Sequence, residues 1–106
     1  MIKVTMQWPN MKMSVIGHAR YAETGKDIVC AAASMLTYAL AGSLEEAHER
    51  GRTSYTMKEK EGTMILEADP NLSNAQEIKA YFRMACKGFR MLHELHPYHI
   101  EIREVN

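Results

Sequence analysis

One amphipathic repeat in the second half of the sequence constrains the fold more than any other feature. Apolar side chains recur there at three- and four-residue steps: Ile78, Phe82, Ala85, Phe89 and Leu92. This spacing places them on one face of a helix, and a second layer of the protein must cover that face to exclude water. Pro97 cannot continue the helix, so we expect the helix to end before it. Cys86 falls close to the same face, and we expect it to be a core residue.

Alternating apolar and polar residues predict the layer that covers this helix, because a period of two is typical of strands with one buried face. The predicted strands cover residues 2–8, 11–15, 55–57, 64–66 and 98–102. Pro9-Asn10 supplies a turn between the first two strands, and residues 59–62 supply one between the next two. We therefore expect two antiparallel hairpins and a final strand.

A second helix is predicted between the two hairpins. Asp27 is a good N-cap, residues 27–40 are expected to be helical, and Gly42 is expected to end the helix. Residues 44–50 are either a separate charged helical turn or a continuation. At the start of the amphipathic helix, Ser73-Asn74-Ala75-Gln76 resembles a capping box.

The predicted elements follow one another in the order β-β-α-β-β-α-β. This order favours an α+β fold, a two-layer sandwich with a mostly antiparallel sheet and two helices on one face. A chain of 106 residues is long enough for one core. We therefore expect a single domain over residues 1–106.

Charge and hydropathy exclude several classes of partner. Thirteen basic and thirteen acidic residues cancel, so no overall field favours nucleic acid or an anionic membrane. The longest apolar run, at residues 28–33, is too short to span a bilayer, and the first residues do not resemble a signal peptide. We expect a cytoplasmic protein whose two cysteines remain thiols.

A cysteine and a histidine lie at the two ends of a glycine-containing loop. Cys30 falls in the first turn of the helix that Asp27 caps, where unpaired N–H groups and the helix dipole favour the thiolate. His18 follows a strand end marked by Gly17, and it could act as the base of a Cys–His pair. Plainer interpretations stay open for Cys30 and Asp27: Cys30 could pack in the core, and Asp27 could serve only as a helix cap. Ser34, one turn after Cys30, could simply bond back to the helix backbone.

The sequence around these residues resembles a known family signature. Gly-His-Ala at residues 17–19 is followed, after seven residues, by Asp-Ile-Val-Cys-Ala-Ala-x-Ser at residues 27–34. This pattern is similar to that of the bacterial ribosomal-processing cysteine proteases, which trim an N-terminal extension from a protein of the large ribosomal subunit. Residues 96–102 resemble the closing strand of the family. Two residues depart from its pattern: His96 replaces an aromatic residue, and Arg20 stands where the family has a small residue, often glycine.

The resemblance implies a role for each residue of the signature. Cys30 would be the nucleophile and His18 the base, with Ser34 and Asp27 as supporting residues. The substrate loop and its hinges would comprise Gly17, Ala19, Arg20, Tyr21 and Gly25. We expect the loop of residues 20–26 to close over the substrate, and the backbone N–H groups at the start of the helix to bind the oxyanion. The resemblance also implies a small α/β fold and a homodimer.

The implied substrate is a protein with an apolar N-terminal extension, and the implied reaction is endoproteolysis. A non-catalytic module, or a relative that acts on another protein such as a phage structural protein, is the alternative. Arg20 could add a local preference for an acidic residue. His93, His96 and His99 are regularly spaced, but Pro97 interrupts the helix between them. We therefore expect structural or solvated roles for these histidines, with no metal and no cofactor.

Overall fold

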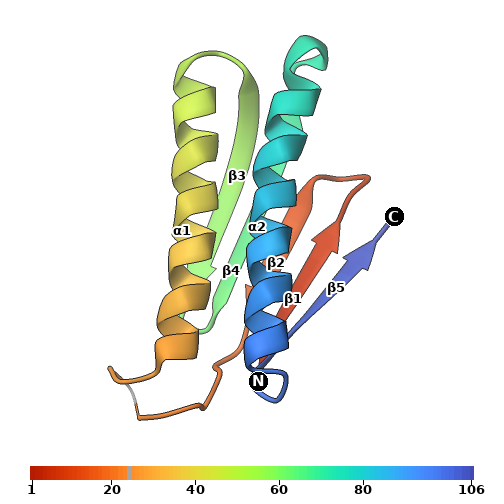
Figure 1. Cartoon of the computed structure of the whole chain (residues 1–106). Helices are drawn as coiled ribbons and strands as arrows, with labels where there is room; N and C mark the ends of the chain where they lie inside the picture. The colour runs from red at the N-terminus through yellow and green to blue at the C-terminus, as the bar shows by residue number, and fades with distance from the viewer. Residues whose placement is uncertain (24) are drawn as a thin grey trace.

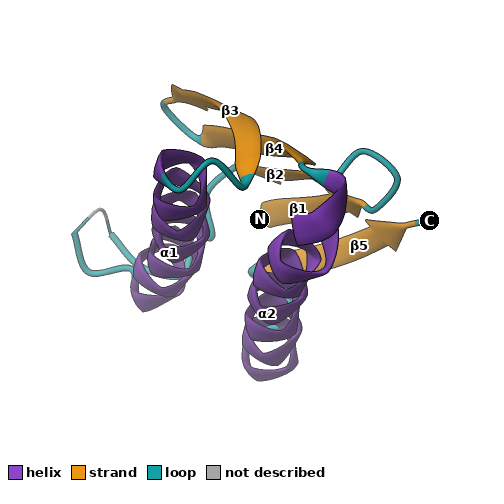
Figure 2. Ribbon diagram, turned by 90° about the horizontal axis from the view of Figure 1, so that it is seen from above, coloured by secondary structure: helices purple, strands orange, loops and turns teal. Residues whose placement is uncertain are grey.

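Five strands form one sheet in the computed structural model, which describes residues 1–23 and 25–106. In sequence order they are β1 (Ile2–Gln7), β2 (Lys12–Ile16), β3 (Thr53–Lys60), β4 (Thr63–Pro70) and β5 (Ile100–Val105). They lie side by side in the order β3-β4-β2-β1-β5. The long helices α1 (Ile28–Glu49) and α2 (Ala75–Leu95) run along the sheet (Figure 1), and Figure 2 shows both on the same face. The predicted α+β two-layer sandwich is confirmed.

Three of the four strand pairs are antiparallel. β1 pairs with β2, β2 with β4, and β3 with β4 in this way. The last strand is the exception, because β5 lies parallel to β1 with Ile100 opposite Ile2. A parallel pair needs a long connection between its strands, and here both helices and the second hairpin lie between them. The pairing of β1 with β5 therefore places the first and last strands side by side, with the two chain ends at opposite ends of the pair (Figure 1).

The core lies between the sheet and the two helices. The amphipathic face of α2 is buried as predicted, with Ile78, Phe82, Cys86 and Phe89 fully enclosed. Each large apolar side chain buried in this way contributes about 1.5–3 kcal/mol. Gly88 allows the two helices to approach closely, since a Cβ atom there would lie 2.6 Å from a methyl carbon of Leu36.

The second predicted helix is longer than expected. α1 runs through Gly42, where we expected it to end, and continues to Glu49. A helix-interior glycine costs about 1 kcal/mol relative to alanine. Burial of Leu40, Leu44 and Ala47 along the same face outweighs that cost. Residues 44–49 therefore continue the helix and are not a separate turn, and Arg50 is the C-cap.

The expected capping box is wrong, and each of the five strands differs from its expected bounds at one end or both. Ser73 belongs to a short 3-10 helix, η1 (Leu72–Asn74), and its hydroxyl contacts Asn74 while no side chain caps α2. β2 begins at Lys12, after Met11 has turned the chain with a positive φ of 45°. β3 continues to Lys60, so its turn is shorter than expected. Tyr98 lies in the turn before β5 and is 84% exposed.

α1 is long and apolar enough, by length and composition alone, to cross a membrane. The expectation above concerned only the apolar run at residues 28–33, which is too short, and did not consider the whole helix. A helix that packs on the core of a water-soluble domain passes the same test. The residues that α1 buries in this fold are Val29, Ala33, Thr37, Leu40, Leu44 and Ala47. The length of α1 is therefore weak evidence for a membrane span.

Candidate active site

Asp27 fixes the start of α1 and joins it to the preceding loop. One carboxylate oxygen, Oδ1, accepts hydrogen bonds from the backbone N–H groups of Val29 and Cys30, each at 3.0 Å. The other oxygen, Oδ2, accepts one from Tyr21 N–H at 3.0 Å. Desolvation by burial raises the pKa of Asp27, but the hydrogen bonds from Cys30, Tyr21 and Ala22 outweigh it and lower the pKa overall. The predicted N-cap is confirmed, and the same side chain also fastens the loop.

The cap changes which backbone groups can bind an oxyanion. We expected these donors at the start of α1, but Asp27 already occupies the N–H groups of Val29 and Cys30. The Cys30 sulfur instead accepts a hydrogen bond from the backbone N–H of Ala19, at 3.3 Å from nitrogen to Sγ. Among the described residues, the donor aimed at the thiol therefore comes from the loop and not from the helix.

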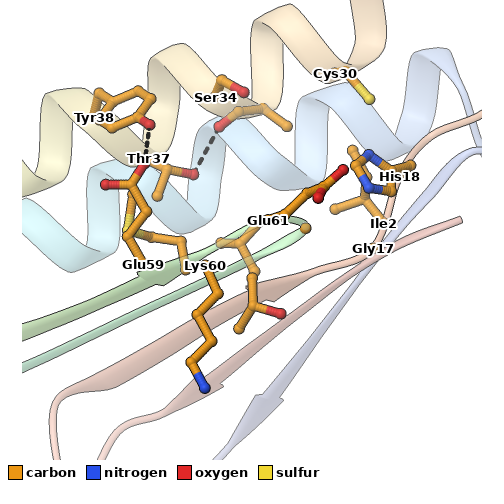
Figure 3. A pocket seen from close by; sticks show the side chains of 15 residues that line it. Ile2, Gly17, His18, Cys30, Ser34, Thr37, Tyr38, Glu59, Lys60 and Glu61 are labelled. Atoms are coloured by element: carbon orange, nitrogen blue, oxygen red, sulfur yellow. Dashed lines mark hydrogen bonds between the residues drawn. The ribbon is translucent and has the colours of Figure 1, made fainter. Parts of the chain in front are cut away.

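His18 and Cys30 line the same pocket, an open cavity of about 470 Å³ shown in Figure 3. His18 is exposed and Cys30 is half-buried. The imidazole lies against Gly62, where a Cβ atom would approach Nε2 to 3.1 Å. Within the described part of the chain, no hydrogen bond joins His18 to Cys30. Hydrogen bonds between catalytic groups are often long or poorly aligned without substrate and tighten when substrate binds.

Most of the remaining wall of the pocket comes from α1 and the β3–β4 hairpin, with Ile2 of β1 and Val15 of β2 also lining it. α1 contributes Ser34 and Tyr38, and the end of the β3–β4 hairpin contributes Glu59, Lys60 and Glu61. The Tyr38 hydroxyl donates a hydrogen bond to Glu59, which raises the pKa of Tyr38. Figure 3 shows Glu61 directed toward His18 and Lys60 directed away from Cys30. Ser34 is exposed to the pocket, where it could contact a ligand.

Sequence reasoning missed the contribution of this hairpin. The turn was predicted, but no local signal links it to His18, which lies more than forty residues earlier in the chain. The link is made by sheet pairing, since Gly17 N–H donates to Gly62 O at 2.8 Å. Gly62 has a positive φ of 71°, and it is the residue that lets the turn approach the imidazole.

The loop between β2 and α1 holds the other predicted site residues. Gly17 has a φ of 101°, and a Cβ atom there would lie 2.5 Å from Met1 O. Arg20 has a φ of 54°, a conformation that glycine adopts without strain and arginine does not. Gly25 also has a positive φ, of 87°. Thr24, which belongs to the predicted substrate loop, lies outside the described residues.

Two histidines near the end of the chain bond to backbone carbonyl groups. Nδ1 of His99 lies 3.0 Å from Ala19 O, and Nδ1 of His93 lies 2.6 Å from Ile100 O. His96 contacts the edge of the Tyr21 ring, with 5.2 Å between ring centroids. The three imidazoles thus do not converge on one point: His93 bonds to the start of β5, whereas His96 and His99 both contact the Tyr21 ring. In the described ranges, no three His, Cys, Asp or Glu residues gather in a way that could hold a metal ion.

Cys86 differs sharply from Cys30. It is fully buried on the inner face of α2, as predicted. Desolvation by burial, together with the charge of Glu104, raises the pKa of Cys86 to about 12, although Arg90 opposes the shift. A thiol with so high a pKa is not a nucleophile near neutral pH.

Comparison with known proteins places this geometry in context. The structure of the ribosomal processing protease Prp from S. aureus with a covalently linked product peptide is 21% identical, with a TM-score of 0.80. The structure of that protease with a substrate peptide is 20% identical, with a TM-score of 0.73. Each match covers 99% of this chain and 100% of the other. SMU.848 from Streptococcus mutans is 23% identical, with a TM-score of 0.67, over 98% of this chain and 91% of that one.

The family assignment rests on sequence and the fold assignment on structure. No curated protein matches the chain. At 20–23% identity the structural likenesses establish the fold. The family model described as cysteine protease Prp matches residues 1–101, nearly the whole sequence. The chain therefore belongs to the Prp family of cysteine proteases.

Proposed function

We propose that this protein is a cysteine endopeptidase in which Cys30 is the nucleophile and His18 is the base. The observation that carries the proposal is that both side chains line one open pocket beside a backbone donor aimed at the sulfur. The match to a cysteine protease family supports the same chemistry. Cys86 is buried and does not compete for this role.

The proposed reaction follows from these positions. His18 takes the proton of the Cys30 thiol, and the sulfur attacks the carbonyl carbon of the scissile peptide bond. The negative charge that develops on the carbonyl oxygen is stabilised by the N–H of Ala19, which is already within hydrogen-bonding distance of the sulfur. The C–N bond then breaks, and His18 returns the proton to the leaving amine. Water attacks the resulting thioester, releases the new carboxylate and restores the thiol.

Asp27 and Ser34 are proposed to support this chemistry without taking part in bond formation. Asp27 holds the N–H groups of Cys30 and Tyr21 together, so it fixes the nucleophile relative to the loop. Ser34 lies on the same pocket wall as Cys30, where its hydroxyl can bind substrate backbone.

We propose that the substrate is an apolar N-terminal extension of a large-subunit ribosomal protein. The S. aureus relative is described as a ribosomal processing protease, and its structures contain peptides. The exposed Arg20 would add a preference for a nearby acidic residue.

We further propose that residues 1–106 form one domain and that the enzyme is a cytoplasmic homodimer. The exposed apolar side chains of Ile28 and Met35 on α1 support a surface for association. Activity on another protein, such as a phage structural protein, remains the alternative.

The proposal is tested by peptide cleavage with single variants. Cys30→Ala and His18→Ala should each reduce kcat by several orders of magnitude, because the members of a nucleophile–base pair fail together. Ser34→Ala should lose less activity, since it removes a hydrogen bond and not the reacting atom. Cys86→Ala is the matched control, which removes a cysteine but leaves the pocket intact. Cleavage is measured on the ribosomal extension peptide, on a version with its aromatic residues changed to alanine, and on a charge-reversed version.

Near-wild-type cleavage by Cys30→Ala would contradict the mechanism. Cleavage that ignores the aromatic residues would contradict the substrate class. If the ribosomal peptide is not cleaved although Cys30 still reacts with iodoacetamide, the alternative target is favoured.

A further inference from the structure

We propose that His99 is a positioning residue that holds Ala19 so that its N–H faces the Cys30 sulfur. This inference rests on the proposed function, because it concerns the geometry of the same nucleophile. His99 immediately precedes β5 and lies eighty residues after Ala19 in the sequence. Its imidazole nevertheless reaches the loop that carries the thiol's hydrogen-bond donor.

Ala19 is held on both sides of its Cα atom. Its N–H donates to the Cys30 sulfur at 3.3 Å, and its carbonyl oxygen lies 3.0 Å from Nδ1 of His99. A carbonyl oxygen can only accept, so Nδ1 of His99 must carry the hydrogen. The Ala19 side chain is 2% exposed, which anchors the residue between the two bonds. The carbonyl and the N–H belong to the two peptide groups that meet at the Ala19 Cα atom. Release of the carbonyl would free the peptide between Ala19 and Arg20, and the adjoining peptide, which carries the Ala19 N–H, would then be held less firmly against the sulfur.

The backbone of His99 is itself fixed to the sheet. Its carbonyl oxygen accepts a hydrogen bond from Ile2 N–H at 2.9 Å, at the start of the parallel β1–β5 pair. The imidazole therefore projects from a rigid strand end, which is a suitable support for precise positioning. A chain of hydrogen bonds thus connects the sheet to His99, His99 to Ala19, and Ala19 to the Cys30 sulfur.

Tyr21 packs against the same imidazole. Its ring meets that of His99 edge-on, with 5.2 Å between centroids and an interplanar angle of 82°. Tyr21 N–H also donates to Asp27, so the loop is fastened to both β5 and α1. The His99 ring thus makes two separable contacts, a hydrogen bond through Nδ1 and an aromatic contact through its edge.

His93 provides a natural comparison. Its Nδ1 also lies near a backbone carbonyl oxygen, at 2.6 Å from Ile100 O. That bond joins α2 to the neighbouring β5 and does not involve the loop. Loss of the His93 bond therefore removes a similar interaction without releasing Ala19.

The experiment separates the two contacts of His99. His99→Phe keeps a ring against Tyr21 but removes the Nδ1 donor, whereas His99→Asn keeps a donor near the Nδ1 position and removes the ring. His93→Phe is the matched control. For each variant, kcat and KM are measured on the peptide substrate, and the rate of Cys30 alkylation by iodoacetamide is measured without substrate.

We expect His99→Phe to lower kcat roughly 10- to 100-fold with little change in KM, since small misplacements of catalytic groups have effects of this size. Its alkylation rate should fall in parallel. His99→Asn should recover most of both rates, and His93→Phe should match the wild type. Thermal unfolding identifies the folded variants, and the smaller His99→Leu replaces His99→Phe if the ring does not fit.

A folded His99→Phe or His99→Leu variant with wild-type kcat and alkylation rate would overturn the inference. So would a His99→Asn variant as slow as His99→Phe, because the donor would then not be the decisive group. Failure of the proposed function gives a different result. In that case the peptide is not cleaved by the wild type, while the alkylation rates still report whether His99 controls the environment of Cys30.

Discussion

At the scale of single residues, Asp27 joins the start of α1, the preceding loop and the proposed nucleophile, Cys30. Its role as a cap was predictable because the partners, Val29 and Cys30, lie two and three residues away. Its bond to Tyr21 was not, because nothing in the local pattern determines how the loop folds back. The contact of His99 could not be predicted from the local pattern either, because its partner Ala19 lies eighty residues earlier in the chain. Cys30 and His18 were predicted as a pair from their spacing and the family resemblance, but the hydrogen-bond donor to the Cys30 sulfur could be found only in the folded chain.

The lowered pKa of Asp27 predicts an acid-dependent loss of stability. Its pKa in the folded protein lies below the ordinary value of 3.8, so the ionised form stabilises the fold fully above that pH. This contribution is lost as pH falls through the folded pKa, because the carboxylate becomes protonated. Asp27→Asn cannot titrate. We expect the difference in unfolding free energy between wild type and Asp27→Asn to shrink between pH 7 and pH values below the folded pKa.

Urea unfolding at several pH values measures this difference. Glu101→Gln, which removes an exposed carboxylate from β5, is the control for a change in net charge. A difference between wild type and Asp27→Asn that stays constant at all pH values would show that the charge of Asp27 does not stabilise the fold.

At the scale of elements, the β3–β4 hairpin supplies the wall opposite Cys30. The alternating pattern predicted the hairpin, but not that its turn would lie beside His18. The end of α1 was predicted too early. Gly42 indicated a helix end there, but the packing of later residues continues the helix. Buried residues beyond Gly42, such as Leu44 and Ala47, keep the helix intact. Local patterns therefore identified the elements, whereas burial and sheet pairing determined their lengths and neighbours.

Two glycines with the same conformation allow the role of the hairpin turn to be tested. Gly62 and Gly51 have φ values of 71° and 72°. A Cβ atom at Gly62 would lie 3.1 Å from His18 Nε2, whereas one at Gly51 would meet nothing within 4 Å. Gly62→Ala and Gly51→Ala should each lose about 1–2 kcal/mol of stability from backbone strain. We expect only Gly62→Ala also to lower kcat, because it displaces the imidazole.

Thermal or urea unfolding gives the stability of both variants, and peptide cleavage gives kcat. Equal kcat values in two folded variants would mean that the turn does not position His18. A loss of kcat in Gly51→Ala as large as that in Gly62→Ala would attribute the effect to stability alone.

At the scale of the whole molecule, net charge conceals a local pattern. The chain is formally neutral, yet Glu59, Lys60 and Glu61 gather at the pocket. Composition alone could not reveal this arrangement, because the sheet brings these residues opposite α1.

Composition also gave no distinction between the two cysteines. Their environments differ because Cys30 lies at the start of α1 beside the pocket, whereas Cys86 lies on the buried face of α2 in the core.

The native fold should therefore protect one thiol and leave the other reactive. Because burial raises the pKa of Cys86 to about 12, we expect a thiol reagent at pH 7 to modify only Cys30 in the folded protein. Both cysteines should react in denaturant, where the burial is lost. Mass spectrometry after brief alkylation counts the modified sites, with Cys30→Ala and Cys86→Ala identifying them. Rapid double labelling of the native protein would contradict the assignment of Cys86 to a closed core.

The parallel pairing of β1 with β5 also bears on how the enzyme is made. A chain emerges from the ribosome with its N-terminal part first, so Cys30 and His18 are synthesised long before His99. An incomplete nascent chain has the thiol and the imidazole but lacks the strand end that secures Ala19. On the proposed role of His99, the surroundings of Cys30 take their final geometry only after β5 has been synthesised and has paired with β1.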